Sequence, residues 1–209
     1  MEQIDTQLFY WINQHHCSLT DWMLWGFSQS WSWAIVLILA FCFTTLRREP
    51  SNWWLVLLGI VLCFLLSDRI SVLCFKDVFC RLRPCHALEH VRMFNTSCGG
   101  QYGFVSSHAA NAFSLALFLS LRNRKALRKS RFTFQGSSSQ NQKTIFPLLI
   151  FLWALIVGYS RPYLGKHYPG DVICGALLGV IIGLFVFYFT KLVENVRNNR
   201  NHKKIFSKR

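Results

Sequence analysis

The chain has 209 residues, of which 52% are hydrophobic, 16% aromatic and 15% charged, a size compatible with one domain. The hydrophobic residues form long blocks, which indicates a polytopic membrane protein and disfavours a soluble helical bundle. Much of the net charge of +14 lies next to these blocks, as topology signals do. No nucleic-acid-reading module accompanies the charge, so nucleic acid is not an expected partner.

The first 30 residues alternate between short apolar and polar stretches. Phe9 and Trp11 belong to an early apolar stretch, and a tryptophan-rich stretch follows Asp21. This pattern is typical of an amphipathic helix in the membrane interface, and we expect one there instead of a full span. The N-terminal Met-Glu-Gln-Ile-Asp lacks the positive charge of a signal peptide, so cleavage is not expected.

Longer apolar stretches predict about five transmembrane helices, which makes the expected fold an all-α polytopic membrane bundle. They cover about 31–46, 53–75, 104–121, 145–159 and 172–192. The third stretch is rich in alanine and serine. The fifth carries Gly175, Gly179 and Gly183 at every fourth position, and small residues at this spacing indicate a helix-packing face.

The distribution of basic residues predicts the orientation. Sixteen of the 23 lysines and arginines lie at Arg47 and Arg48, in a loop at 122–143, or in the tail from Lys191. Alternating spans place these three segments on one side, which is cytoplasmic by the positive-inside rule. We therefore predict one membrane-embedded domain over residues 1–209. It has an interfacial segment at 1–30, a cytoplasmic basic loop at 122–143 and a basic tail at 193–209.

Polar clusters at three helix ends then share the opposite, periplasmic or extracellular face. Lys76 and Arg83 are seven residues apart, which predicts one helical face, and Pro84 is a natural helix stop. Two cations suit a phosphate, because the arginine fork holds two of its oxygens; the plainer alternative is snorkelling to lipid headgroups. Asp68 and Arg69, inside the second span, are expected to face the bundle interior or a wet cavity, and the favoured role of Asp68 is to pair with Arg69 or with a neighbouring helix.

The other two clusters contain histidines. Ser106, Ser107 and His108 lie where the third helix starts, and their hydroxyls either cap it or help its free N–H groups to bind an anion. The histidine is placed to protonate a leaving alkoxide. His167 and Asp171 flank a Tyr-Pro-Gly turn. Asp171 either caps the fifth helix or holds His167 in the tautomer whose other nitrogen attacks phosphorus.

In order and spacing, these clusters resemble the three-part signature of the type 2 phosphatidic acid phosphatase and vanadium haloperoxidase superfamily. The matching residues are Lys76-x6-Arg83-Pro84, Ser106-x-His108 and Ser160-Arg161-x5-His167-x3-Asp171. The resemblance covers residues 76–171. The second part departs from the family's usual Pro-Ser-Gly-His, because Val105 and Ser107 replace the proline and the glycine, while the hydroxyl and the imidazole are kept.

The resemblance implies a lipid phosphatase of the bacterial inner membrane that uses no metal and no other cofactor. By position, His167 is the nucleophile that forms a phosphohistidine, Asp171 orients it, and His108 is the general acid. The implied phosphate-binding residues are Lys76, Arg83, Ser106, Ser107 and Arg161.

The natural substrate is left open by the sequence. The resemblance implies undecaprenyl diphosphate, phosphatidylglycerol phosphate, phosphatidic acid or lipid A, and we favour a polyprenyl diphosphate on family grounds alone. Phosphate transfer to a second lipid is one competing interpretation. Another is an inactive lipid-binding protein, suggested by Val105 and Ser107. A haloperoxidase is disfavoured because those relatives are soluble. The oligomeric state is not indicated.

The segment after Pro84 carries two further patterns. His86-Ala-Leu-Glu89-His90 matches the motif of inverted zinc peptidases. The only downstream glutamate, Glu194, is predicted across the membrane, so we expect no metal site. Cys85 and Cys98 flank an exposed loop, where a disulfide and two free thiols are both compatible with the sequence.

Overall fold

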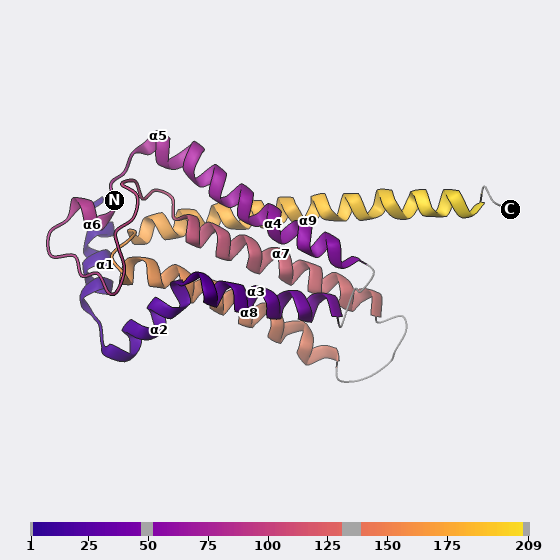
Figure 1. The fold of residues 1–209 in the computed structure, drawn as a ribbon, viewed down its shortest axis with the longest axis horizontal. Coiled ribbons are helices and arrows are strands. Elements are labelled where there is room, and N and C mark those ends of the chain that lie inside the picture. Colours follow the sequence, from indigo (N-terminus) through magenta and orange to yellow (C-terminus); the bar gives the residue numbers. More distant parts are fainter. Residues whose placement is uncertain (1, 47–51, 131–138, 207–209) are drawn as a thin grey trace.

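The computed structural model describes residues 2–46, 52–130 and 139–206, and within these ranges it consists of helices and connecting loops. The long helices run side by side, and the chain ends lie at opposite ends of the molecule (Figure 1). The expectation of an all-α bundle is confirmed.

The bundle is built around α7 (Ser107–Ser130), which packs against α4 (Trp53–Ile70), α8 (Ser139–Tyr163) and α9 (Pro169–Phe206). Ala109, Ala110, Ala112 and Ala116 of α7 are fully shielded from solvent, whereas α8 and α9 expose large apolar side chains such as Leu148, Leu155, Ile181 and Phe185. A small-residue interior with an apolar exterior is typical of a bundle surrounded by lipid.

The glycine stripe on α9 lets this helix approach α7 closely. A Cβ added at Gly175, Gly179 or Gly183 would lie 2.5, 2.4 or 2.7 Å from a backbone carbonyl oxygen of residues 106–114. Any side chain at these positions would push the two helices apart. The prediction that the stripe is a helix-packing face is confirmed.

Three helices are long and apolar enough to cross a membrane: Trp53–Phe79, Ile145–Tyr163 and Pro169–Arg200. A fourth span results if α2 (Ser18–Ser28) and α3 (Ser30–Leu46), which are bent by 65° at their junction, are taken together. Within the described residues, the central helix α7 is not among them. The expected number of about five spans therefore stays a prediction.

The second span continues beyond its expected end. After α4, a π-helical turn (Ser71–Lys76) leads into α5 (Asp77–Phe79). Ser67 and Ser71 line the buried side at this level, and the Ser67 hydroxyl donates to Ser114 on α7 at 3.2 Å. Asp68 and Arg69 are exposed on the outer side. The expectation that these two charges face the bundle interior is wrong, because the close contact with α7 admits only small side chains.

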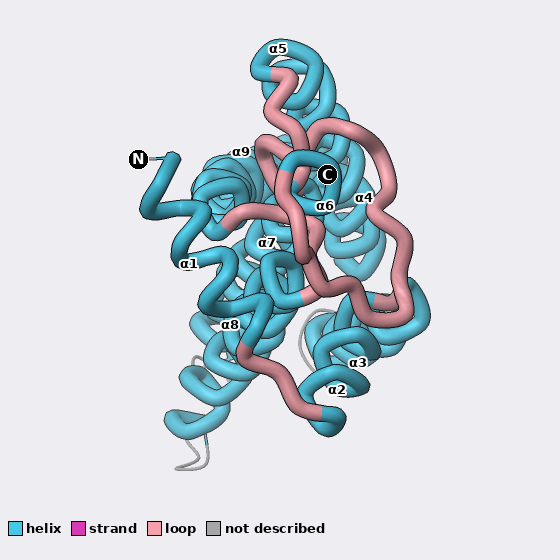
Figure 2. The backbone as a smooth tube through the Cα atoms, turned by 90° about the vertical axis from the view of Figure 1, so that its left-hand side faces the viewer, coloured by secondary structure: helices cyan, strands magenta, loops and turns pink. Residues whose placement is uncertain are grey.

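The N-terminal segment forms two helices, α1 (Glu2–Gln14) and α2, where one was expected. α1 crosses the end of the bundle and contacts α8 and α9, at the same end of the molecule as α6 (Pro84–Ala87), as the end view in Figure 2 shows. Phe9 is fully buried, with its ring centroid 5.8 Å from that of Tyr168. The buried Asn13 amide donates to the carbonyl oxygens of Arg92 and Tyr163, both at 2.9 Å. These contacts dock α1 firmly onto the bundle.

The basic segments are more helical than expected. α7 continues to Ser130 and α8 begins at Ser139, so the predicted loop at 122–143 is helical on both sides of residues 131–138. Those residues, like Arg47 and Arg48, lie outside the described part of the chain. α9 continues to Phe206, well past residue 192. Hydropathy shows where the apolar surroundings end, whereas lysine and arginine are good helix formers that let a helix continue into water.

An ion pair joins α7 and α9 at the end remote from α1 and α6. The Arg122 Nη1 lies 2.9 Å from Glu194 Oε2, and both side chains are buried. The Asn52 amide donates to the other carboxylate oxygen at 3.4 Å. This buried pair is therefore balanced in charge.

Candidate active site

The three polar clusters gather at the end of the bundle that carries α1 and α6 (Figures 1 and 2). Lys76 ends the π-helical turn, and Arg83 lies in an extended stretch before α6. Arg161 is in the last turn of α8, and Asp171 is in the first turn of α9. His167 lies on the turn between those two helices. The sequence interpretation, in which distant segments form one site, therefore agrees with this arrangement.

His167 is buried on a tight turn. Gly165, with a φ of 77°, shapes this turn, and a Cβ there would lie 2.9 Å from the carbonyl oxygen of Arg92. The Nδ1 of His167 faces Asp171 Oδ2 at 3.6 Å, longer than a hydrogen bond, and Nε2 faces the Arg83 Nη1 at 3.4 Å. Burial, followed by the charges of Arg83 and Arg161, holds the pKa of His167 well below its ordinary value. The imidazole is therefore neutral at physiological pH, as a nucleophile must be.

Three cations of the signature lie around this imidazole without a carboxylate of their own in the described structure. Lys76 Nζ donates to the Ser107 hydroxyl at 2.7 Å. Arg161 is 1% exposed and donates from Nη2 and Nε to the neutral Ser160 hydroxyl at 3.0 and 3.2 Å. Burial lowers the pKa of Arg83. Arg161 is buried and Lys76 and Arg83 are half-buried. Cations that are withdrawn from water without an opposite charge are costly, so their convergence indicates a site that binds an anion.

The start of α7 supplies the remaining signature residues. The Ser106 N–H donates to the Asp171 carbonyl oxygen at 3.0 Å, which joins the second and third clusters through their backbones. The buried Ser106 hydroxyl accepts the N–H of Ala109 at 3.4 Å. His108 is exposed, its ring centroid is 5.9 Å from that of Trp33, and the charge of Arg161 is the largest cause that lowers the pKa of His108 well below its ordinary value. An accessible histidine beside a buried one suits proton exchange with a bound molecule.

Lys76 and Arg83 converge in a different way from the one expected. The helix ends at Cys80, whose φ of 47° is left-handed, and residues 81–83 are extended. Pro84 then begins α6 instead of ending a helix. The expectation that Lys76 and Arg83 share one helical face is wrong, because a seven-residue spacing has that meaning only within a continuous helix.

Sequence reasoning missed Arg81, Asp5 and Lys166. Arg81 donates to the Asp171 carboxylate at 2.8 Å and to the Asp5 carboxylate at 2.7 Å. Lys166 is half-buried, and burial followed by Arg161 and Arg83 lowers its pKa to about 8. Arg81 and Lys166 both occupy unassigned positions within the signature. No local pattern marks Asp5, since its partner is 76 residues away.

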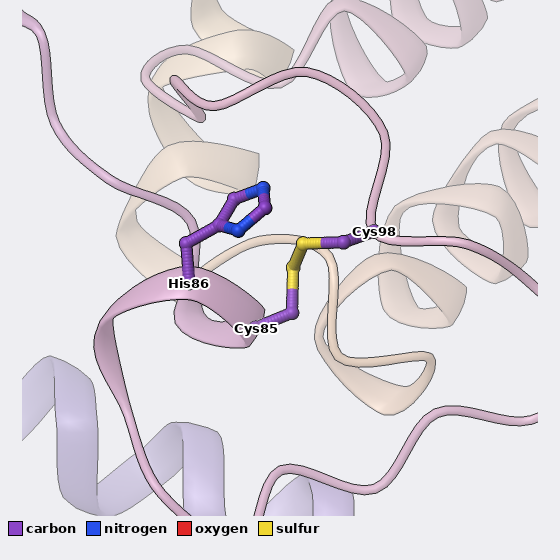
Figure 3. A group of neighbouring side chains, drawn as sticks. All are labelled: Cys85, His86 and Cys98. Carbon is purple, nitrogen blue, oxygen red and sulfur yellow. A yellow bond between two sulfur atoms is a disulfide. The ribbon is translucent and has the colours of Figure 1, made fainter.

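The segment between Pro84 and the start of α7 is closed by a disulfide. Cys85 and Cys98 are bonded, with their Cα atoms 6.0 Å apart (Figure 3). The His86 ring lies beside them, but sulfurs bonded to each other are not thiolate ligands. His86 lies in the four-residue α6 and His90 beyond it, so they do not share a helix face as zinc peptidase ligands do. Glu194 lies at the remote end of the bundle. The zinc motif is therefore a chance match.

Comparison with known proteins agrees with this geometry. The model of the PAP2 superfamily matches residues 52–194. The lipid A 4'-phosphatase of Porphyromonas gingivalis is 33% identical over 189 residues, which cover 88% of this chain and 72% of the relative. That of Bacteroides thetaiotaomicron is 30% identical over 213 residues, covering 95% and 83%.

A solved structure shares the fold. The transmembrane PAP2-type phosphatidylglycerolphosphate phosphatase of Bacillus subtilis superposes with a TM-score of 0.67 over 92% of this chain and 87% of its own, at 19% identity. The superfamily match covers more than half of the chain, and it includes all three polar clusters. The protein is thus a membrane lipid phosphatase, and its chain belongs to the PAP2 superfamily.

Proposed function

We propose that the protein removes a phosphate from a lipid A-type glycolipid through a phosphohistidine intermediate on His167. The observation that supports this most directly is the convergence of a buried, neutral imidazole with Lys76, Arg83 and Arg161. Among the described residues these three cations have no carboxylate partner, so they match the charge of a phosphate ester, and the imidazole supplies the nucleophile.

The reaction has two steps. In the first, Nε2 of His167 attacks phosphorus, the bond between phosphorus and the lipid oxygen breaks, and His108 gives its proton to the departing alkoxide. In the second, His108 takes a proton from a water molecule that attacks the same phosphorus. The phosphorus–nitrogen bond then breaks, and inorganic phosphate leaves. Asp171 holds the ring and offsets the positive charge that develops on it.

The cations and the neighbouring hydroxyls bind the phosphoryl oxygens. Lys76, Arg83 and Arg161 neutralise charge in both the bound ester and the transition state, and Ser106 and Ser107 complete the pocket. These groups are held in place before the substrate arrives, Lys76 by its bond to Ser107 and Arg161 by its bonds to Ser160. Little reorganisation is then needed during the reaction.

The choice of lipid A rests on the two relatives named lipid A 4'-phosphatase, each similar over most of its length. The preference for a polyprenyl diphosphate came from the wider family and has no counterpart in these two relatives. Undecaprenyl diphosphate, phosphatidic acid and phosphatidylglycerol phosphate are the alternative substrates. Transfer to a second lipid is the alternative reaction, because the phosphohistidine can react with a lipid hydroxyl as well as with water.

The site is proposed to face the periplasm or the exterior, with the C-terminus in the cytoplasm and the protein in the bacterial inner membrane. Two independent features support this orientation. The basic ends of α7, α8 and α9 lie opposite the site, as the positive-inside rule requires. The disulfide lies on the side of the site, and disulfides persist in oxidising compartments.

The direct test is phosphate release by the purified protein in detergent, with the metal chelator EDTA present, from a panel of lipid A, undecaprenyl diphosphate, phosphatidic acid and phosphatidylglycerol phosphate. We expect lipid A to be the best substrate by kcat/KM, and His167→Gln to abolish release. Preferred hydrolysis of another lipid would overturn the substrate proposal alone. Undiminished release by a folded His167→Gln protein would overturn the mechanism. A phosphorylated lipid product in place of free phosphate would identify a transferase.

A further inference from the structure

We propose that helix α1 completes the active site, with Asp5 and Arg81 acting as positioning residues that hold Asp171 in place against His167. This inference rests on the roles proposed above for His167 and Asp171. It adds a part of the chain that lies far outside the three-part signature and outside the matched residues 52–194.

Arg81 connects the two carboxylates through the two terminal nitrogens of its guanidinium group. Its Nη1 lies 2.8 Å from Asp171 Oδ1, and its Nη2 lies 2.7 Å from Asp5 Oδ2. The guanidinium carbon stacks 4.0 Å above the ring centre of Tyr168, the residue next to His167. A planar fork held at both ends and on one face has little freedom to rotate. The position of Arg81 is therefore fixed from three sides.

Asp5 also forms a hydrogen bond with the backbone between His167 and Asp171. Its Oδ1 accepts the N–H of Gly170 at 2.7 Å, in the first turn of α9. A Cβ at position 170 would lie 2.8 Å from Asp5 Oδ2, so only glycine leaves room for this contact. The first N–H groups of a helix lack partners within the helix. The carboxylate of α1 thus satisfies one of them from outside, next to Asp171.

These contacts decide which oxygen of Asp171 faces the imidazole. Oδ1 is taken by Arg81, whereas Oδ2 accepts the N–H of Tyr168 at 3.0 Å and faces His167 Nδ1. The Asp171 side chain is fully buried, and a buried carboxylate needs a cation to stay ionised. Lys76, Arg83 and Arg161 are placed to bind the phosphate, so Arg81 is the cation left for Asp171. Without Asp5, Arg81 would lose one of its two anchors, and the carboxylate would lose its fixed orientation.

A positioning role for Asp5 and Arg81 and a purely structural role predict different effects of substitution. Contacts that only stabilise the fold would affect the folded fraction and the binding of substrate. A positioning network affects the reacting geometry, because displacing a catalytic group by ~1 Å can cost about 100-fold in rate with little effect on binding. Substitutions in a positioning network are therefore expected to lower kcat while KM stays constant.

The test measures kcat and KM in detergent for the lipid of the panel above that the wild-type protein hydrolyses best, with the thermal unfolding midpoint of each variant recorded in parallel. We expect Asp5→Asn to lower kcat by about 10-fold and Arg81→Gln by about 100-fold, with KM changed by less than about twofold. Asp5→Glu should recover part of the loss. Glu2→Gln is the matched control, since it removes an exposed acidic group from the same helix and should leave both constants unchanged.

The double variant Asp5→Asn/Arg81→Gln provides the sharper criterion. If Asp5 acts through Arg81, the double variant is no slower than Arg81→Gln alone, because the losses of groups that act in series do not add. Unchanged kcat in folded Asp5→Asn protein, or losses that multiply in the double variant, would overturn the inference. Wild-type and His167→Gln proteins are assayed beside them. A failure of the underlying mechanism appears as activity in His167→Gln, whatever Asp5 does.

Discussion

The two ends of the bundle each bury an arginine, but they do so in opposite ways. Arg122 is fully buried against the carboxylate of Glu194. Arg161 is equally buried, yet its hydrogen-bond partner is the neutral hydroxyl of Ser160. A balanced pair is an ordinary structural solution, whereas an unbalanced cation requires an anion that arrives later. The two ends therefore differ in the charge pairing of their buried arginine, and not in how deeply that arginine is buried.

The largest contrast should come from replacing each arginine with methionine. Arg161→Met removes a proposed phosphate ligand, and we expect kcat/KM to fall by about 1000-fold. Its thermal stability should not fall, because the substitution removes an uncompensated buried charge. Phosphate release and thermal unfolding, measured on the same preparation, provide the check. Activity within tenfold of wild type would contradict the assignment of Arg161.

Arg122→Met should show the reverse behaviour. It removes the cation of the buried ion pair between Arg122 and Glu194, and breaking such a pair costs about 3–5 kcal/mol of stability. The double variant Arg122→Met/Glu194→Leu removes both charges and should recover most of that loss. Specific activity of the folded fraction should match wild type in both variants. A loss of activity at unchanged stability would place this pair in the mechanism.

A smaller effect is expected at the helix contact that joins the two ends. Gly179→Ala places a Cβ 2.4 Å from the carbonyl oxygen of Ala110. Overpacking of this kind costs about 1–3 kcal/mol, which exceeds the gain of roughly 1 kcal/mol from replacing glycine within a helix. Gly100→Ala is the control, because nothing lies within 4 Å of its Cβ. The unfolding midpoint should fall only for Gly179→Ala, and equal midpoints would contradict the close approach.

The smallest effect concerns Lys166, whose pKa is lowered to about 8 by burial and by Arg161 and Arg83. Its charge is present below that pH and lost above it. The parameter kcat/KM reports the free enzyme, so it should fall by about threefold to tenfold as pH rises from about 7 to about 9. Lys166→Arg keeps the charge and should remove this fall. A fall that persists in the variant would assign it to another group.

The sequence predicts those parts of the molecule that depend on neighbours along the chain. The glycine stripe and the small residues of α7 indicate their packing directly, because the helical period places them on one face. The three polar clusters are recognisable because each lies where an apolar stretch stops. Their arrival at one end of the bundle follows from alternating spans.

Other features depend on contacts that no local pattern records. The change of direction at Cys80 carries Arg83 away from the helix of Lys76, although hydropathy and spacing suggest a continuous helix. The Asp5–Arg81–Asp171 network joins residues whose separation in sequence exceeds 70 positions. The helical ends at 122–130 and beyond 192 follow from helix propensity in water, which a membrane-based interpretation does not consider.

The glycine stripe has a consequence for the path that a lipid takes into the molecule. Along residues 175–183, α9 and α7 meet backbone to backbone, and no hydrocarbon tail fits between surfaces in such contact. These helices act as one rigid wall, with Asp171 at one end and the Arg122–Glu194 pair at the other. The fatty chains of a substrate must therefore enter along another side of the bundle, and an amphiphile bound there would leave this wall unmoved.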